Sequence, residues 1–282
     1  MTQVSFEFFP GRDRQSHDGL ITTAVGLAES FHPRFVSVTY GAGGTTQDHT
    51  IRAVSDLAQQ LTVPVAGHLT TVNSSISQVH EVIDQYIDAG VDHIVALRGD
   101  PPKQPTPATK GGYETAADLV EGIRQRQDGN KFKIFVAAYP EVHPRAKSPQ
   151  DDLENLKRKL DVGADEAISQ FFFDPDVFLN FLDQARSANI DAPIVPGLIP
   201  ITNFNRIQHF AQSCGATVPS WLTKLMSGAE SDPELSQLLA ASVLAHQCRQ
   251  LEKAGIDKVH IYTMNRRPLT ATVCHVLGLN RP

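Results

Sequence analysis

The sequence has no long hydrophobic run. None of its apolar stretches reaches the roughly 18 consecutive residues that a membrane-spanning helix needs. Its opening residues, MTQVSFEFFP, also lack the basic segment and apolar segment of a secretory signal peptide. We therefore expect a cytoplasmic protein that has no membrane partner.

Basic residues are in the minority. The 282 residues include 25 Lys and Arg against 31 Asp and Glu, which gives a formal charge of -6. A nucleic-acid-binding protein normally presents a basic face to the phosphates. The charge balance therefore argues against a nucleic-acid partner.

Cysteine is scarce, and the usual metal and nucleophile motifs are missing. The three cysteines, Cys214, Cys248 and Cys274, are odd in number and far apart, so we expect reduced thiols in the core. The sequence contains no HExxH motif and no paired His/Cys cluster with zinc spacing, so we expect no metal site. A GxSxG nucleophile motif is absent as well.

Eight short runs rich in β-branched and aromatic residues divide the chain, and amphipathic stretches of helical length fill nearly every gap between them. The runs are 4–9, 35–40, 63–70, 93–98, 133–139, 166–173, 193–199 and 258–264. Their continuous apolar character is typical of parallel strands covered on both faces. We predict an α/β protein in which residues 1–282 form a single (βα)8 TIM barrel, with a doubly wound sheet as the structural alternative.

Local signals support helices between these strands. Asp174-Pro175 and Asp232-Pro233 each combine an N-cap residue with proline at the first helical position, and the second helix should end at Gly255. A short helix is expected around Trp221. Residues 99–114, rich in Pro and Gly, are expected to form a long loop after the fourth strand.

Polar residues stand where the predicted strands end. Active sites of (βα)8 barrels lie at this end of the strands. Each residue alone also has a structural interpretation: Glu7 could pair with Arg98 or Arg266, and His68 could be a core histidine. Their convergence predicts a functional site, and the residues are Glu7, Thr39, Tyr40, His68, Arg98, Asp100, Tyr139, His143, Gln170, Tyr262, Asn265 and Arg266.

The predicted helix at 148–160 carries a polar stripe beside its leucine stripe. Asp152, Asn155 and Lys159 lie on one face at helical spacing. Such a stripe could hold the ribose and diphosphate of a nucleotide cofactor. A solvated face is the more common explanation, and the residues alone favour it.

Several functions remain open at this point. The GAGG run at 41–44 could bind a phosphate, although it lacks the last glycine of the GxGxxG dinucleotide motif. A phosphate- or pterin-binding barrel lyase or methyltransferase, and a ligand-binding barrel without catalysis, are the alternatives to an oxidoreductase.

The order of the motifs resembles one family. VSFEFFP, FVSVTYGAGG, HIVALRGDPP, VAAYPEVHP, LKRKLDVGAD, ISQFFFD, PGLIPITNF and HIYTMNR stand as they do in the 5,10-methylenetetrahydrofolate reductases, from Val4 to about Gly278. The chain is most similar to the bacterial form that consists of the catalytic domain alone. The resemblance implies a barrel with noncovalent FAD, reduced by NADH or NADPH. It also implies ping-pong reduction of 5,10-methylenetetrahydrofolate to 5-methyltetrahydrofolate, which supplies methyl groups for methionine synthesis, and it is compatible with a homo-oligomer.

The resemblance also implies roles for individual residues. Glu7 would be the general acid, and Asp100 the carboxylate between flavin and folate. The substrates would contact Thr39, Gln170, Phe210 and Arg266. The implied FAD residues are Thr39, Tyr40, Ala42, His68, Arg98, Gly99, Asp100, Tyr139, His143, Ala146, Asp152, Asn155, Arg158 and Lys159.

Two positions depart from the family pattern. Gly11 stands where a second proline is common, and Arg206 replaces a glutamine near folate, so Arg206 receives no role. Tyr113 lies in a loop of different length and is also left unassigned.

The implied chemistry makes demands on both carboxyl groups. Opening the methylene bridge requires a proton on a folate nitrogen, so we expect burial among Phe6, Phe8 and Phe9 to raise the pKa of Glu7. An ionised Asp100 would stabilise the cationic iminium.

Overall fold

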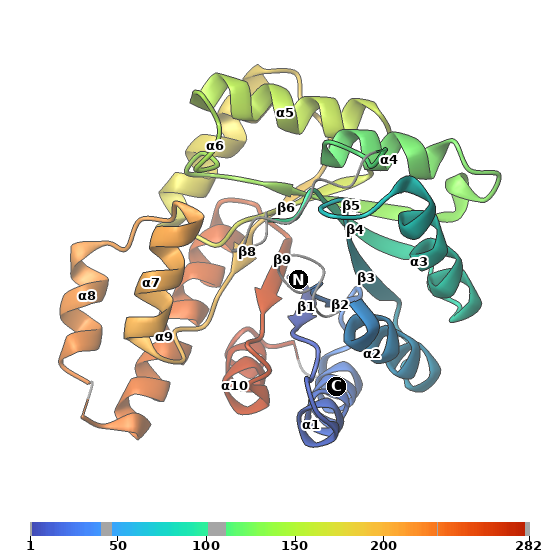
Figure 1. Cartoon of the computed structure of the whole chain (residues 1–282). Coiled ribbons are helices and arrows are strands. Elements are labelled where there is room, and N and C mark those ends of the chain that lie inside the picture. Colours follow the sequence, from blue (N-terminus) through green and yellow to red (C-terminus); the bar gives the residue numbers. More distant parts are fainter. Residues whose placement is uncertain (1, 41–46, 101–110, 230, 280–282) are drawn as a thin grey trace.

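A computed structural model describes residues 2–40, 47–100, 111–229 and 231–279 of the chain. Its strands lie at the centre and its helices form an outer layer around them (Figure 1). The strands are β1 (Gln3–Phe8), β2 (Val36–Val38), β3 (Val65–Thr70), β4 (His93–Leu97), β5 (Lys133–Ala138), β6 (Glu166–Ser169), β7 (Ile194–Val195), β8 (Gly197–Leu198) and β9 (Lys258–Tyr262).

The helices alternate with the strands along most of the chain. They are α1 (Arg14–Phe31), α2 (Gln47–Gln60), α3 (Ile76–Asp88), α4 (Ala116–Arg124), the short 3-10 helix η2 (Gly129–Lys131), α5 (Pro149–Asp161), α6 (Pro175–Ser187), α7 (Phe204–Cys214), α8 (Ser220–Ser227), α9 (Pro233–Lys253) and α10 (Arg267–Val276).

The sheet closes on itself. Every strand pair is parallel, and the order is β7-β6-β5-β4-β3-β2-β1-β9-β8. β7 pairs with β6 and β8 pairs with β9, while Pro196 alone separates β7 from β8. The two pieces therefore occupy one strand position, and the predicted (βα)8 barrel is confirmed.

The break in this strand has a local cause. Proline has no backbone N–H to donate to a ladder, but the Pro196 carbonyl still accepts a 2.9 Å hydrogen bond from the His260 amide. At the next residue, a Cβ would lie 2.1 Å from the Ser169 carbonyl oxygen, so only Gly197 fits there. The chain bends at this point, so β7 before the bend pairs with β6 and β8 after the bend pairs with β9.

The predicted helix signals are confirmed. Asp174 and Asp232 cap α6 and α9 through their side chains, with proline in the first turn. Gly255 has a φ of 89°, in the left-handed region expected after α9. The helix expected around Trp221 is α8.

The sixth predicted strand was too long. β6 ends at Ser169, and Phe171 to Phe173 follow it in irregular structure although all three are buried. Phe172 stacks on Phe178 of α6 with ring centroids 5.3 Å apart. Their apolar character therefore serves packing against helices and not strand pairing.

Two apolar layers hold the barrel. Inside it, Phe35, Ala66, Val95, Phe135 and Ile168 form a buried cluster, and the Phe35 and Phe135 rings stack 4.4 Å apart. A much larger cluster lies between strands and helices. The interior of the barrel at this level is therefore a packed core and not a channel.

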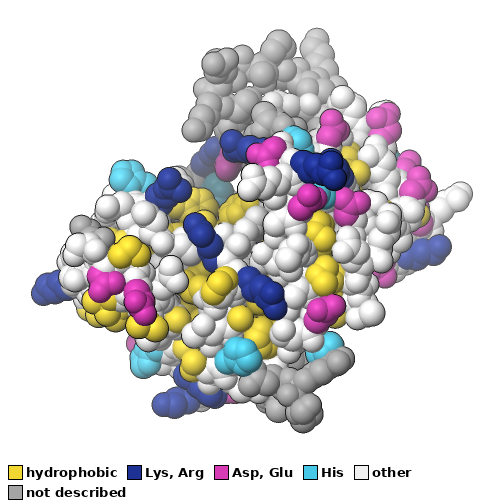
Figure 2. Space-filling model, turned by 90° about the horizontal axis from the view of Figure 1, so that it is seen from below, with side chains coloured by type: hydrophobic (Ala, Val, Ile, Leu, Met, Phe, Trp, Pro, Cys, Tyr) yellow, Lys and Arg dark blue, Asp and Glu magenta, His cyan; other side chains and the backbone are white. Residues whose placement is uncertain are grey.

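The surface carries charges of both signs (Figure 2), and the three cysteines are unpaired, as the composition leads one to expect. Figure 2 shows Lys and Arg interspersed with Asp and Glu, with small hydrophobic areas between them. Cys214, Cys248 and Cys274 are free thiols, and Cys248 and Cys274 are buried, whereas Cys214 is only partly so. In the described ranges no helix is long and apolar enough to cross a membrane.

A buried ion pair lies at the end of the barrel where the strands begin. Arg34, two residues before β2, donates two hydrogen bonds of 3.0 and 2.8 Å to the carboxylate of Glu166, the first residue of β6. Glu166 is 2% exposed. Removing one partner of such a pair leaves an uncompensated buried charge.

We predict that Arg34→Met lowers the free energy of unfolding by about 3–5 kcal/mol, measured by urea denaturation. The double variant Arg34→Met/Glu166→Leu should recover most of the loss because no charge is then left unpaired. Lys157→Met, which breaks the exposed Lys157–Asp161 pair, serves as the control and should cost less than about 1 kcal/mol. A loss for Arg34→Met no larger than that of the control would contradict the role of the pair.

Candidate functional site

A cavity of about 450 Å³ opens where the strands end. Its wall combines acidic, aromatic and amide side chains from the strand ends with residues of the loops that follow. The lining residues are Glu7, Phe9, Arg12, Thr39, Tyr40, His68, Val95, Leu97, Asp100, Val136, Ala137, Tyr139, Ile168, Gln170, Phe171, Ile199, Phe210, Tyr262 and Met264. We call it the strand-end cavity.

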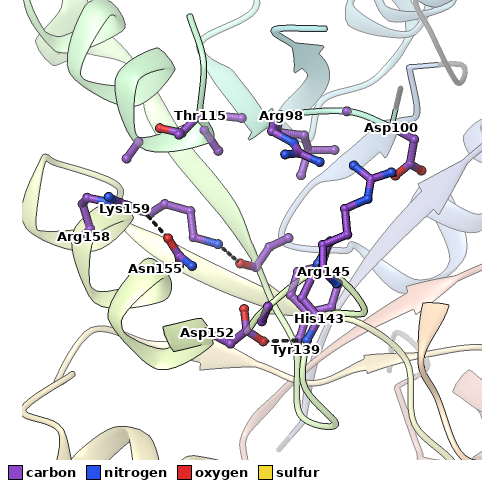
Figure 3. A pocket seen from close by; sticks show the side chains of 17 residues that line it. Arg98, Asp100, Thr115, Tyr139, His143, Arg145, Asp152, Asn155, Arg158 and Lys159 are labelled. Atoms are coloured by element: carbon purple, nitrogen blue, oxygen red, sulfur yellow. Dashed lines mark hydrogen bonds and ion pairs between the residues drawn. The ribbon is translucent and has the colours of Figure 1, made fainter. Parts of the chain in front are cut away.

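A second cavity of about 300 Å³ lies between the end of β4, α4 and α5 (Figure 3). It carries Arg98, Arg145, Arg158 and Lys159 on its wall, together with Thr115, His143, Ala146, Asp152 and Asn155. Leu97, Asp100, Ala137 and Tyr139 line both cavities, so the two adjoin. We call this one the cationic cavity.

Glu7 is held by two histidines at the floor of the strand-end cavity. Its Oε2 lies 3.1 Å from Nε2 of His68 on β3 and 3.4 Å from Nε2 of His260 on β9. The other ring nitrogen of His260, Nδ1, shares a 2.8 Å hydrogen bond with the hydroxyl of Ser5. Parallel pairing of β1 with β9 places Ser5 beside His260 in register.

The expected effect of burial on Glu7 is reversed. Burial does raise its pKa, but the attraction of His68 and His260 and the hydrogen bond with His260 together outweigh burial and lower the pKa to about 2. Glu7 is therefore a carboxylate near neutral pH, and the prediction of a raised pKa is wrong. Among the described residues, the ion-pair partners of Glu7 are His68 on β3 and His260 on β9, and not Arg98 or Arg266.

Some buried polar atoms in this region have no hydrogen-bond partner. His68 Nε2 lies within ion-pair distance of Glu7 but does not meet hydrogen-bond geometry, and the Thr70 hydroxyl at the end of β3 has no partner either. Buried polar groups are normally satisfied. His68 lines the strand-end cavity and its Nε2 faces Glu7, so it is not a satisfied core histidine, whereas Thr70 lines neither cavity.

The polar stripe of α5 faces the cationic cavity. Lys159 donates a 2.5 Å hydrogen bond to the Ala137 carbonyl of β5, and Asp152 accepts one of 2.7 Å from the His143 amide. Arg158 donates to the Asn155 side chain (Figure 3). The stripe therefore lines a cavity with its three residues partly exposed, and its contact with a cofactor stays a prediction.

Burial also shifts ionisation along this stripe. It lowers the pKa of Lys159 to about 8, and it raises the pKa of Asp152 despite the hydrogen bond from His143. Both shifts have the direction expected for charged groups that lack a strong partner. An anionic ligand would supply that partner for Lys159.

Most of the remaining predicted residues lie on the two cavities. Thr39, Tyr40, Gln170 and Phe210 line the strand-end cavity, and Phe210 packs on Phe171 with ring centroids 5.2 Å apart. Gly99, with a φ of 81°, lines the cationic cavity, and a Cβ there would lie 2.8 Å from a Val72 methyl carbon. Burial raises the pKa of Tyr139, which stands where the cavities meet.

A few predicted residues lie elsewhere. Arg266 is the N-cap residue of α10 and lines neither cavity. Asn265 clamps the loop after β1 through two 2.9 Å hydrogen bonds with the backbone of Phe9. Ala42 and the GAGG run lie outside the described residues. Tyr113 bonds to His80 at 2.9 Å, away from both cavities.

The sequence did not reveal every residue of the site. Ser5 and His260 lie inside strands, where the alternation of β1 and β9 would have placed them on the Glu7 side. Arg12, Thr115 and Arg145 lie in loops or at a helix start, where no periodic signal exists. Proximity in the chain to Glu7 and His143 could have indicated Arg12 and Arg145, but nothing in the sequence indicated Thr115.

Comparison with known protein families gives a match over nearly the whole chain. The family model described as methylenetetrahydrofolate reductase matches residues 1–278. The chain belongs to the methylenetetrahydrofolate reductase family. Family membership implies a flavin, NAD(P)H and a folate substrate.

Individual relatives agree with this assignment. The chain is 41% identical to 5,10-methylenetetrahydrofolate reductase of Pectobacterium carotovorum subsp. carotovorum, over 98% of this chain and 90% of the relative. It is 40% identical to the protein of the same name from Salmonella typhimurium, with the same coverage. Methylenetetrahydrofolate reductase (NADH) 1 of Arabidopsis thaliana is 34% identical over 99% of this chain but only 48% of the plant protein.

Solved structures support the fold alone. A Clostridium thermocellum protein described as binding two copies of 5-methyl-5,6,7,8-tetrahydrofolic acid aligns with a TM-score of 0.65 at 14% identity, covering 98% of this chain and 93% of that one. Oxaloacetate acetylhydrolase aligns with a TM-score of 0.53 at 12% identity, over 100% and 85% of the two chains.

Among the described residues no group of three or more His, Cys, Asp or Glu could hold a metal ion.

The low pKa of Glu7 predicts how acid affects stability. A fall from 4.5 in the unfolded chain to about 2 in the folded protein corresponds to roughly 3 kcal/mol. This contribution is present above pH 4.5 and is lost as the pH falls towards 2. Glu7→Gln should therefore lower the free energy of unfolding by roughly 3 kcal/mol at pH 7 and by less than half of that at pH 3.

Urea denaturation at the two pH values measures this difference. Glu81→Gln, a change at an exposed residue of α3, is the matched control and should stay within about 0.5 kcal/mol of the wild type at both. An equal loss for Glu7→Gln at pH 7 and pH 3 would contradict the charged state of Glu7.

Proposed function

We propose that this protein carries noncovalent FAD and reduces 5,10-methylenetetrahydrofolate to 5-methyltetrahydrofolate, with NADH or NADPH as the electron donor. The product would supply methyl groups for methionine synthesis. The observation that carries the proposal is the Glu7 cluster beside the cationic cavity, in a chain that belongs to this family over residues 1–278.

The cationic cavity has the chemistry that an adenine dinucleotide needs. Arg98, Arg158 and Lys159 offer positive charge to a diphosphate, and the oxygen atoms of Asp152 and Asn155 suit ribose hydroxyl groups. His68, Thr39 and Tyr40 line the adjoining strand-end cavity and offer polar groups to the flavin ring system. Every FAD residue implied by the resemblance, apart from Ala42, lines one of the two cavities.

The bound flavin would supply the hydride, and the protein supplies position and charge. Because Glu7 is ionised, the proton that the folate nitrogen takes up must be held by the cluster of Glu7, His68 and His260 and not by an isolated carboxyl group. Glu7 is the member of the cluster that lies on the cavity wall beside His68. A proton held by one of the histidines would pass to the Glu7 carboxylate and from there to the folate nitrogen, which returns Glu7 to its ionised form, and His260 with Ser5 lies behind it.

Asp100 is placed to act on a positive charge. It lines both cavities, and 78% of its side chain is exposed. An ionised carboxylate there stabilises a cationic folate intermediate by direct attraction. Gln170 and Phe210 line the same strand-end cavity and offer an amide and an aromatic face to the substrates, together with Thr39. A role for Arg266 would require a substrate that extends beyond the cavity.

Lys159 allows a test of cofactor binding that does not depend on turnover. Loss of a charge-assisted contact of about 1.5–3 kcal/mol predicts that Lys159→Ala weakens FAD binding roughly ten- to a hundredfold. In the wild type, the affinity should also fall as the pH rises above 8, because Lys159 must then take up a proton to pair with the diphosphate. Titration of apo-protein with FAD, followed by fluorescence quenching, measures both effects.

Lys159→Arg is the matched variant for this titration. It keeps a positive charge at high pH and should therefore bind FAD without the loss above pH 8. An FAD affinity that Lys159→Ala leaves unchanged would remove Lys159 from the cofactor site.

Glu7 separates the two halves of the reaction. Since Glu7 is assigned only to proton delivery to folate, Glu7→Gln should still allow NADH or NADPH to bleach the flavin absorbance, whereas methylenetetrahydrofolate should no longer restore it. Anaerobic stopped-flow absorbance records each half reaction. A wild-type protein that takes up no flavin and shows no turnover would refute the proposed function, and it would favour a binding barrel without catalysis. Equal loss of both half reactions in Glu7→Gln would refute only the role of Glu7.

One strand-end cavity must serve both substrates. Hydride transfer requires near contact of donor and acceptor atoms, so nicotinamide and folate should take turns, and we predict ping-pong kinetics with parallel double-reciprocal lines. Phe210→Ala should slow both half reactions, because it removes from each substrate an aromatic contact of about 0.5–1.5 kcal/mol. Intersecting lines, or a defect with one substrate alone, would contradict a shared cavity.

A further inference from the structure

Arg145 joins the two loops that meet between the cavities. It lies between β5 and α5, and its Nη2 is 3.7 Å from Oδ1 of Asp100, which follows β4. Figure 3 shows its side chain extending from the neighbourhood of His143 to Asp100. Both residues line the cationic cavity, and Asp100 lines the strand-end cavity as well. Arg145 was not among the residues implied by the family resemblance.

The backbone around Arg145 is fixed by hydrogen bonds. Its amide donates to His143 Nδ1 at 3.0 Å, and the His143 amide donates to Asp152 Oδ2 at 2.7 Å. The Ala146 amide donates to the His143 carbonyl at 2.8 Å. The first residues of α5 therefore hold the turn from which the guanidinium reaches Asp100.

Asp100 has few other charged neighbours. Arg98 lines the cationic cavity, but no ion pair joins it to Asp100, and Tyr139 and Cys214 are close enough for the carboxylate to raise their pKa values. In the part of the chain that the structure describes, Arg145 is the only cation within ion-pair distance of Asp100. Within these described residues, the cationic control over this carboxylate is therefore concentrated in one side chain.

In water this contact is weak. The side chains of Arg145 and Asp100 are 44% and 78% exposed, and exposed ion pairs contribute little. A cofactor that fills the junction of the cavities would displace water from both groups, and the attraction between them would then be less screened. The pair is thus poised to matter in the loaded enzyme and not in the free protein.

We propose that Arg145 is a positioning residue that acts through Asp100. It holds the carboxylate at the junction of the cavities and offsets its negative charge beside the cofactor. This inference rests on the proposed function. Since an uncompensated carboxylate disfavours the electron-rich reduced cofactor, Arg145 favours reduction and keeps Asp100 directed towards the cationic folate intermediate.

The test is the equilibrium constant for reduction of bound FAD, measured anaerobically against a reference dye. Arg145→Ala should lower it at least fivefold, because Asp100 is then free to move and is no longer offset. Arg145→Lys keeps the positive charge and should therefore have an equilibrium constant within about twofold of the wild-type value. Lys147→Ala removes the same charge from an exposed residue of the same loop, and it should leave the constant unchanged.

A double-mutant cycle shows whether Arg145 acts through Asp100. In an Asp100→Asn background, Arg145→Ala should change the equilibrium constant less than twofold. If Arg145→Ala lowered the equilibrium constant equally with Asp and with Asn at position 100, the proposal would be overturned, because Arg145 would then act on the cofactor by its own charge. No fall in the single variant, or the same fall in Lys147→Ala, would overturn it as well.

These outcomes are distinct from failure of the proposed function. A wild-type protein that takes up no FAD would refute the function and this inference together. A wild-type protein that takes up FAD and is reduced and reoxidised, while Arg145→Ala behaves like Lys147→Ala, would leave the function standing and refute the role of Arg145 alone.

Discussion

Closure of the parallel sheet is the constraint on which the site depends. The chain bends at Pro196-Gly197, so one strand position pairs with β6 through Ile194–Val195 and with β9 through Gly197–Leu198. Once the ring is closed, the ends of all strands face one mouth. Residues as distant in the chain as Glu7 and His260 then lie side by side, and the two cavities share a wall.

Within that mouth, burial and charge oppose each other with different results. Two histidines overcome the burial of Glu7 and keep it ionised. Lys159 donates a hydrogen bond to the Ala137 carbonyl, but the attraction of Asp152 does not outweigh burial, so its pKa falls to about 8. The first arrangement keeps a charged carboxylate between two histidines. The second leaves a cation that gains most from an anionic ligand, which matches a site for a diphosphate beside a site for proton transfer.

Periodicity and residue type predicted the barrel because eight apolar runs alternate with amphipathic helices. The positions of the strand ends in the sequence also indicated Glu7, His68, Asp100 and Tyr139 as members of one site. The ionisation of Glu7 could not be predicted in the same way, since it depends on His260, a residue inside a strand more than 250 positions away. The surroundings of the helix stripe ending in Lys159 could not be predicted for a related reason, because periodicity gives the face of a helix but not what that face covers.

The most direct test of this account is a crystal structure of the protein with FAD. The account predicts that the diphosphate lies against Lys159 in the cationic cavity, and that the flavin ring lies at the junction formed by Asp100 and Tyr139, with Glu7 open to the folate side. FAD bound outside these two cavities, or a flavin ring separated from the Glu7 cluster by protein, would contradict it.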